Sequence, residues 1–545
     1  MLKKILKVLG WFVGGAAVIA GLLFIHVWYF KPFSIDIFFA REALQFALRS
    51  PETLTSLRIL EPMGIDYYND DLDDASVESG DRMFEQIKDA RETLASYDNE
   101  SLDETDLMSK RIAMSLLDMA VKGEEFRFHN YPVNQMFGVQ SNFPSFMESS
   151  HLIEDVEDAE DYIARLSKVD TKFSQVLEGL RLREQKEILP PKFVVQRVLD
   201  EMNGFVQTPP KENILYTSFA DKLDEAGVAE DRRGRLEQRV VDEIESTVYP
   251  TYEELIAYFD GLQGEIETNH GVWKLPNGDA FYRLALRFFT TTDMTPQEIH
   301  ELGLREVDRL QGEILAILRE QGRAQGMEFK AAIQALKDDP RFYFPDTQQG
   351  REQILAEYRA IIEEANQAVG AVFNVTPEAE VVVKRVPEFK EKTAPGAYYQ
   401  SPSMDGSRPG TFYANLYDIE ATPKYGMRTL AYHEAVPGHH FQRAIQQEQE
   451  DLPFFRKLAP FTAYTEGWAL YTERLAWEIG LQDNPYDNIG RLQAELFRAV
   501  RLVVDTGIHH KRWSRERAID YMLANTGMAE SDVVAEIERY FVMPG

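Results

Sequence analysis

The spacing of apolar residues restricts the fold of this chain more than any other feature of the sequence. Through long stretches, such as 156–185 and 295–321, apolar residues recur at intervals of three and four. That period places them on one face of an α-helix. The second stretch opens with Thr295 and Pro296, followed by Glu298, which is typical of a helix N-cap and first turn. The sequence therefore predicts a mostly α-helical protein.

One part of the chain has a different pattern. Residues 379–389 are short and rich in β-branched side chains, and residues 395–418 combine turn residues with alternating aromatic residues. These features predict one small β-sheet with tight turns. A length of 545 residues exceeds one small core, so we expect two lobes. We place an N-terminal anchor at 1–34, a helical lobe at 35–365, and the sheet with a catalytic helical lobe at 366–545.

Charge and cysteine content exclude several classes of protein. The chain carries 90 acidic against 59 basic residues, a net charge of −31, which argues against nucleic acid as a partner because phosphate binding needs clustered basic residues. The sequence has no cysteine, so it cannot form disulfides, thiolate zinc sites or a lipidated cysteine anchor.

The N-terminus indicates a membrane anchor. Three lysines, Lys3, Lys4 and Lys7, precede an apolar run from Val8 to Phe30. Such a run is long enough to cross a bilayer core, which takes about 20 residues in a helix. We expect a single uncleaved span in the bacterial inner membrane, with the lysines in the cytoplasm and the main domain in the periplasm.

A histidine motif near residue 433 points to metal chemistry. His433 and Glu434 begin as the zinc-peptidase motif does, in which two histidines four apart bind zinc and the glutamate acts as general base. Here a Pro-Gly pair intervenes before His439 and His440. Pro437 disrupts a regular helix, and a bulge at this point would bring His439 to the position of the second ligand. We prefer His439, with His440 as the alternative.

A third ligand is expected from the next helix. The chain breaks after the motif, and equal arms around that break would place Glu466 opposite His439 in an antiparallel helix hairpin. Glu473 lies on the same face two turns further on. It is the alternative ligand or a partner that orients a ligand.

A second constellation follows near residue 505. Arg501, Asp505 and His509 recur every four residues and would share one helix face. Asp505 could orient His509, whose other nitrogen would then stabilise an oxyanion. Arg498 or Arg501 could bind a substrate carboxylate through two hydrogen bonds.

Longer stretches of the chain resemble a known family. The sequence is similar to the bacterial domain of unknown function 885 family, whose members resemble gluzincin zinc metallopeptidases. The resembling stretches are 271–304, 398–418, 432–442, 465–473 and 501–522. The resemblance implies a helical, two-lobed, cleft-bearing peptidase-like fold in which the small sheet precedes a zinc helix.

The same resemblance implies roles for individual residues. It assigns one Zn²⁺ to His433, His439 and Glu466, and the general base to Glu434. In gluzincins an edge strand before the zinc helix pairs with the substrate backbone. Residues 410–417 occupy that place, so Tyr413, Asn415 and Arg408 are expected to bind substrate.

These expectations combine into a functional hypothesis. We expect a zinc-dependent peptidase that hydrolyses short peptides outside the cytoplasm, as a carboxypeptidase or oligopeptidase, with His509 or Tyr521 stabilising the oxyanion. The alternatives are a zinc amidase acting on non-peptide amides, and a catalytically inactive binding or scaffold protein. The resemblance implies a further segment like Gln-Ala-Leu-Ala-Tyr-Lys past the position of Gly545. Either the sequence is truncated there or this member does without the segment, and the second case would be compatible with the scaffold. The oligomeric state is not predicted.

Overall fold

The structure is a computed structural model, and the chain divides into two compact units. The first comprises Met1–Asn269 and Pro453–Arg456, and the second His270–Leu452 and Lys457–Gly545. The described residues are 2–58, 60–264, 266, 268–386, 391, 395–402, 409–458 and 461–545. The predicted boundary at 365/366 lies inside the second unit, because the helices before the sheet pack with those after it.

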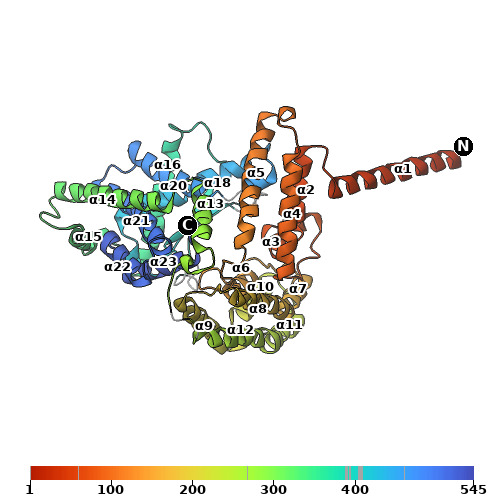
Figure 1. Cartoon of the computed structure of the whole chain (residues 1–545), viewed down its shortest axis with the longest axis horizontal. Coiled ribbons are helices and arrows are strands. Elements are labelled where there is room, and N and C mark those ends of the chain that lie inside the picture. Colours follow the sequence, from red (N-terminus) through yellow and green to blue (C-terminus); the bar gives the residue numbers. More distant parts are fainter. Residues whose placement is uncertain are drawn as a thin grey trace. The chain divides into compact units, whose positions relative to one another are not determined.

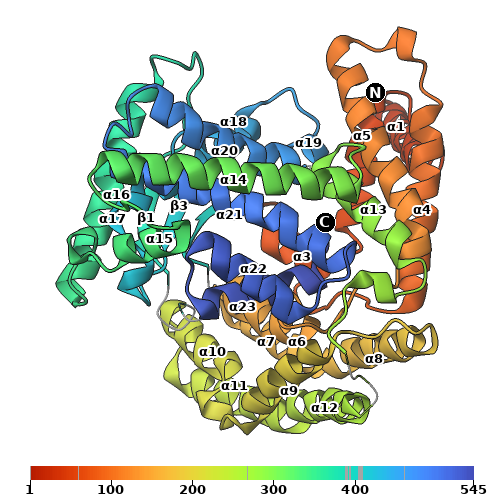
Figure 2. The same cartoon turned by 60° about the vertical axis from the view of Figure 1, so that its left-hand side comes forward.

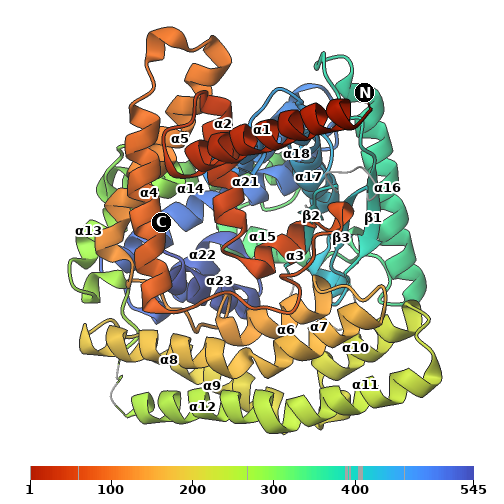
Figure 3. The ribbon, with the colours of Figure 1, turned by 90° about the vertical axis from the view of Figure 1, so that its right-hand side faces the viewer.

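The regular secondary structure of the first unit is helical in its described residues. Its α-helices are α1 (Leu2–Tyr29), α2 (Ile35–Ala47), α3 (Pro51–Leu57), α4 (Val77–Ala95), α5 (Glu104–Gly123), α6 (Val139–Ser149), α7 (Val156–Ser167), α8 (Val169–Gln185), α9 (Lys192–Gln207), α10 (Ile214–Glu225), α11 (Glu230–Glu243) and α12 (Tyr249–Gln263). Helices α4 and α5 lie side by side, as do α9 and α12 (Figures 1 and 3). The predicted helical stretch 156–185 is thus two helices, α7 and α8, that meet at Lys168.

Helix α1 covers the stretch predicted to cross a membrane. Among the described residues, however, no helix is both long and apolar enough to do so. The predicted single-pass span is therefore not supported.

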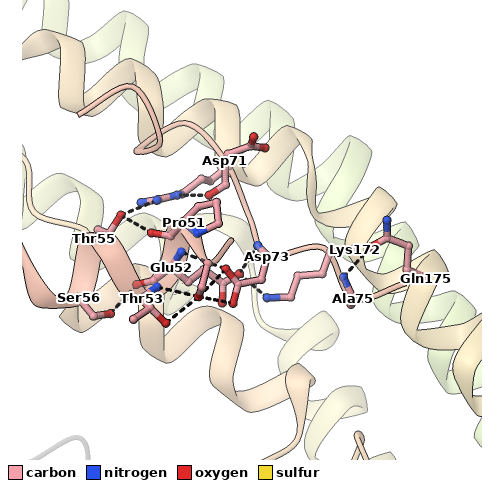
Figure 4. Close-up of polar contacts among 12 residues, drawn as sticks. Pro51, Glu52, Thr53, Thr55, Ser56, Asp71, Asp73, Ala75, Lys172 and Gln175 are labelled. Atoms are coloured by element: carbon pink, nitrogen blue, oxygen red, sulfur yellow. Dashed lines mark hydrogen bonds and ion pairs between the residues drawn. The ribbon is translucent and has the colours of Figure 1, made fainter. Parts of the chain in front are cut away.

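A polar network ties α3 to α8 inside the first unit (Figure 4). The Asp73 carboxylate accepts hydrogen bonds from Ser50 Oγ at 2.9 Å and from the Glu52 backbone N–H at 3.2 Å. Lys172 donates to the Glu52 carboxylate, and the lysine side chain is only 11% exposed. Burial and the neighbouring Glu52 raise the pKa of Asp73, and Lys172 opposes this shift. The ammonium thus opposes the effect of burial and of Glu52 on the Asp73 carboxyl.

We expect Lys172→Ala to lower the free energy of unfolding by about 2–3 kcal/mol, because it leaves two half-buried carboxylates facing each other. Lys168 on the same unit provides the matched control. It pairs with Asp70 at 3.0 Å, but its side chain is 37% exposed, so Lys168→Ala should cost less than about 1 kcal/mol. Urea unfolding followed by circular dichroism measures both. Equal losses would show that the network adds nothing beyond a surface ion pair.

The second unit combines helices with a small sheet. Its α-helices are α13 (Gly278–Thr290), α14 (Pro296–Glu320), α15 (Phe329–Lys337), α16 (Gln348–Val369), α17 (Lys424–Glu434), α18 (His439–Glu448), α20 (Thr462–Glu478), α21 (Pro485–His509), α22 (Arg515–Thr526) and α23 (Glu530–Val542), and α19 (Phe454–Leu458) runs from the first unit into the second. Helix α14 begins with the predicted cap, in which Thr295 and Glu298 form a reciprocal capping box.

Helices α14 and α21 lie side by side along most of their lengths (Figure 2). Their close approach depends on Gly303, where an added Cβ would lie 2.8 Å from the side chains of Leu502 and Val503. His300 of α14 also meets Thr506 of α21, with 2.7 Å between Nδ1 and Oγ1. This contact fixes α21, which carries part of the candidate site.

The sheet has three strands in the order β1–β3–β2, with β1 (Val381–Arg385) parallel and β2 (Ala397–Gln400) antiparallel to β3 (Gly410–Ala414). One face packs on α16 and α17, where Phe412 meets Tyr358 at 4.9 Å between ring centroids. The prediction of a mostly helical protein with one small sheet before the histidine motif is confirmed. The predicted edge strand at 410–417 is wrong, because β3 is paired on both sides.

Candidate metal centre

The two histidines of the motif come from separate helices. Helix α17 ends at Glu434 and α18 begins at His439, so the predicted bulge is a break in the helix. Between them the Val436–Pro437 peptide is cis, and Trp468 Nε1 donates to the Pro437 carbonyl at 2.9 Å. A Cβ at the glycine that follows would clash with the carbonyl oxygens of Tyr432 and His433. The Pro-Gly pair therefore folds the chain sharply enough to return His439 to the end of α17.

His433, His439 and Glu466 meet at this break. One donor atom from each lies within 4.8 Å of the others. The Glu466 carboxylate oxygens lie 3.5 Å from His433 Nε2 and 3.6 Å from His439 Nε2. Ligands about 2.05 Å from a tetrahedral zinc would be about 3.3 Å apart. The spacing and the chemistry of the three donors thus fit Zn²⁺.

Glu473 contacts the first of these three donor residues. Its Oε1 lies 2.8 Å from His433 Nδ1, and the Glu473 side chain is only 1% exposed. A carboxylate that accepts from Nδ1–H leaves Nε2 free to face Glu466. Arg498 completes the group, with Nη2 3.4 Å from the same Glu473 oxygen. Glu473 thus contacts His433 and is not part of the donor group.

Burial and charge act differently on each member of the site. Burial lowers the pKa of His433, but the Glu466 and Glu473 carboxylates outweigh this and raise it to about 9. The hydrogen bond with His433 lowers the pKa of Glu466 to about 2. Burial lowers the pKa of His439 to about 4 and raises that of Glu434 to about 6. The carboxylates thus favour positive charge beside His433, while Glu434 holds a proton more readily than an exposed glutamate does.

His440 points away from the group. Its Nδ1 lies 2.9 Å from the Tyr399 hydroxyl, and its Nε2 lies 3.0 Å from the Ala379 carbonyl oxygen. Both ring nitrogens are therefore engaged with β2 and the segment before β1. The structure favours His439 over the alternative His440.

A cavity of about 1060 Å³ in the second unit reaches the site. His433, Glu473 and Arg498 line it. Two helices that run side by side in the same direction, α17 and α21, form part of its wall. Gly490 of α21 lies against the Tyr425 carbonyl of α17. Eight residues further along each helix, Arg498 of α21 lies beside His433 of α17. The cavity therefore extends along α17 from the histidine group.

The residues predicted to stabilise an oxyanion lie elsewhere. His509 is fully buried, its Nδ1 accepts from the Val272 N–H at 3.1 Å, and its Nε2 lies 2.9 Å from the Tyr540 carbonyl oxygen. Asp505 accepts from the Tyr282 hydroxyl at 2.5 Å and lies 3.9 Å from His509. These bonds occupy both His509 nitrogens in packing, so the assignment of His509 to the oxyanion is wrong, as is that of Asp505 to its orientation. Tyr521 packs on Trp513 at 5.4 Å between ring centroids, outside the histidine group.

The predicted substrate-binding residues are spread over the second unit. Arg498 lies at the site, whereas the Arg501 guanidinium lies over the Phe497 and Tyr540 rings and does not join the group. Tyr413 stacks on Tyr398 at 4.8 Å between centroids. Asn415 and Arg408 were also expected to bind substrate. Asn415 Nδ2 donates to the Glu391 and Pro395 carbonyls, and Arg408 lies outside the described residues.

Three residues near the site were not anticipated from the sequence. Tyr399 holds His440, and Trp468 caps the turn carbonyl between the helices. Thr429 lines the cavity one helical turn before His433. The position of Thr429 could have been predicted, because a spacing of four residues places it on the same helix face as His433. The other two contacts join segments distant in sequence, and no local pattern reveals them.

Fold and site together define a mostly helical protein with a small sheet and a buried His-His-Glu group. The chain belongs to the family described as bacterial protein of unknown function (DUF885), whose model matches residues 51–545. Its structure is similar to that of a putative lipoprotein from Colwellia psychrerythraea, with 34% identity, a TM-score of 0.89, and coverage of 94% of this chain and 89% of that one. A putative lipoprotein of unknown function from Shewanella oneidensis shares the fold, with 16% identity, a TM-score of 0.68, and coverage of 94% and 90%. No curated protein matches the chain.

Proposed function

We propose that the protein is a zinc-dependent peptidase that hydrolyses short peptides. The observation that carries this proposal is the convergence of His433, His439 and Glu466 donor atoms within 4.8 Å, next to a cavity. Two imidazoles and one carboxylate are the ligand set of many hydrolytic zinc sites, which keep a fourth position open. The similarity of the family to gluzincins is part of the same proposal.

The residues present would hold the ion as follows. His433 and His439 offer Nε2 and Glu466 offers carboxylate oxygens, while Glu473 fixes the His433 tautomer. Bound zinc supplies a Lewis acid that activates water for attack on a carbonyl. The Glu466 side chain is 53% exposed, so the open side of the group faces solvent.

Other residues of the chain carry the proton and the charge. Glu434 follows His433 directly and accepts the proton of the attacking water, then returns it to the leaving amine. Its raised pKa, which burial brings to about 6, suits a group that must take and release a proton. We assign Arg498 to the negative charge that develops on the carbonyl oxygen, because its Nη2 lies 3.4 Å from His433 Nε2 beside the cavity.

The location proposed is extracytoplasmic and membrane-associated. The solved relative at 34% identity is described as a putative lipoprotein, which supports this location. The present sequence contains no cysteine, so a lipidated cysteine is not part of this proposal.

Metal content tests the proposal directly. We expect about one zinc per chain after reconstitution, measured by elemental mass spectrometry. His433→Ala and His439→Ala should lose it, and His440→Gln should keep it. His510→Ala removes an exposed histidine and is the matched control, with circular dichroism to check folding of every variant. A chain that binds no zinc, or loses it equally in His510→Ala, contradicts the proposal. Cleavage of a mixture of short peptides, followed by mass spectrometry of the products, then separates a peptidase from an amidase.

A further inference from the structure

The cavity beside the histidine group has a second end of different chemistry. From His433 it extends along α17 toward the N-terminal end of that helix, where the loop before α17 contributes Asp418 and Glu420 to its lining. The start of α17 lies nine residues before His433, a distance of about 13 Å at the helical rise of about 1.5 Å per residue. The two ends are therefore separate binding positions in one cavity.

Four exposed carboxylates gather at this second end, which we call the acidic mouth. Its members come from the C-terminal cap of α15, the segment before α17, and α23: Asp338, Asp418, Glu420 and Asp532. Partial burial raises the pKa of Asp532, the neighbouring Asp418 adds to the shift, and Lys337 opposes it. The proximity of these like charges is unfavourable unless a cation lies between them.

The carboxylates of the acidic mouth have no counter-charge in an ion pair among the described residues. Asp418 accepts from the Glu420 backbone N–H at 2.9 Å, and Asp338 accepts from Gln334 at 2.8 Å. Lys337 lies nearby but donates to the Gly527 carbonyl oxygen at 2.9 Å. By contrast, Asp346 on the same cavity wall pairs with Arg351 at 2.9 Å. The negative charge of the mouth is thus left for a ligand.

Two buried polar atoms on the cavity wall point independently to a ligand. Thr429 is 4% exposed, and its Oγ1 has no hydrogen-bond partner within the described part of the chain. Glu473 is 1% exposed, and its Oε2 also has no hydrogen-bond partner within the described part of the chain. Both residues line the cavity, Glu473 at the histidine end and Thr429 one helical turn from His433 toward the second end. Buried polar atoms are rarely left unsatisfied, so polar groups of a bound molecule are expected beside them.

We propose that the acidic mouth binds a cationic group of the substrate, either a lysine or arginine side chain or a free amino terminus. This inference rests on the proposed peptidase function. An extended peptide advances about 3.3 Å per residue, so the cation lies about four residues from the bond that is cleaved. The acidic mouth selects peptides by charge, while the histidine group acts on the backbone.

The test uses the full zinc-loaded chain and neutral octapeptides. One series is capped at both ends and carries a single lysine at each position in turn, a second carries glutamate instead, and a third has a free amino terminus and no lysine. Mass spectrometry gives kcat/KM. Calorimetric titration of Glu434→Gln with the same peptides gives affinity without turnover.

We expect lysine at the best position, or the free amino terminus, to raise kcat/KM and affinity about fivefold over the neutral peptide. Asp418→Asn with Asp532→Asn should remove that advantage. Asp483→Asn with Asp520→Asn changes two exposed carboxylates outside the cavity and should retain it. The advantage of lysine over the amino terminus, or the reverse, identifies the source of the cation.

Two results would overturn the inference. One is an equal response to lysine, glutamate and neutral peptides. The other is an equal loss in both double variants, which would assign the preference to the overall charge of −31. Failure of the peptidase proposal gives a different pattern, in which the cationic peptides still bind preferentially but none is cleaved. Cleavage without a charge preference would support the peptidase proposal and contradict only the proposed role of the acidic mouth.

Discussion

Replacement of Glu434 by glutamine is expected to lower kcat for peptide cleavage by about 10³-fold, the range of a general base, without loss of bound zinc. Glutamine keeps the size of the side chain and cannot accept the proton of the attacking water. Glu434 lies next to His433 but is not part of the donor group of His433, His439 and Glu466. The proposed function therefore assigns binding of the ion and proton transfer to different residues, and the two can be measured separately.

Single-turnover cleavage and elemental analysis of the same preparation check this expectation. Glu450→Gln alters an exposed glutamate in the same unit and is the matched control. If Glu434→Gln still cleaves peptides at the original rate, another residue acts as the base. If zinc is lost with activity, Glu434 supports the metal centre, and the assigned role is wrong.

The sequence predicts the type of the elements better than their grouping. Helical periodicity and the Thr295–Glu298 cap are local, and the structure contains both. The boundary between the units lies at Asn269 and His270 because α14 packs on α21, more than 150 residues later. That pairing depends on Gly303 fitting against Leu502 and Val503. Apolar periodicity shows that a helix has a buried face, but not which helix covers it.

The candidate site was predictable where it depends on local geometry. The Pro-Gly pair leaves His439 as the preferred donor with His440 as the alternative, the hairpin spacing points to Glu466, and the structure brings His439 and Glu466 to His433. The choice of His439 over His440 needed the orientation of the turn. Arg498 reaches the group because α21 runs beside α17. The position of Arg498 depends on how two helices pack together, and the residue spacing within one helix does not predict that packing.

His509 shows how a correct local pattern can suggest a wrong role. Asp505 and His509 do lie one turn apart on α21. Val272 and Tyr540, from distant segments, take both nitrogens of the imidazole. Spacing predicts which side chains share a face, but a catalytic role also requires that the face be open. Here the face is packed against the rest of the unit.

Replacement of Glu473 by glutamine is expected to weaken zinc binding by about 10- to 100-fold, the usual effect of removing a carboxylate that supports a histidine ligand. Glutamine can still accept the hydrogen bond from His433, but it removes the negative charge. That charge lies 2.8 Å from His433 and 3.4 Å from Arg498, with the carboxylate almost fully buried. Without it, the Arg498 guanidinium stays beside the ligand and disfavours a second cation.

Competition for zinc with a chelating dye measures this loss. Glu478→Gln lies on the same helix α20, where Glu478 forms an exposed pair with Arg474, and it should leave zinc affinity unchanged. A second variant, Arg498→Gln, separates charge from geometry. If the charge of Glu473 mainly offsets Arg498, then combining Glu473→Gln with Arg498→Gln should restore part of the affinity. If Glu473 acts only by orienting the imidazole, the double variant should bind no better than Glu473→Gln alone. Unchanged zinc affinity in Glu473→Gln would contradict its role as the partner of His433.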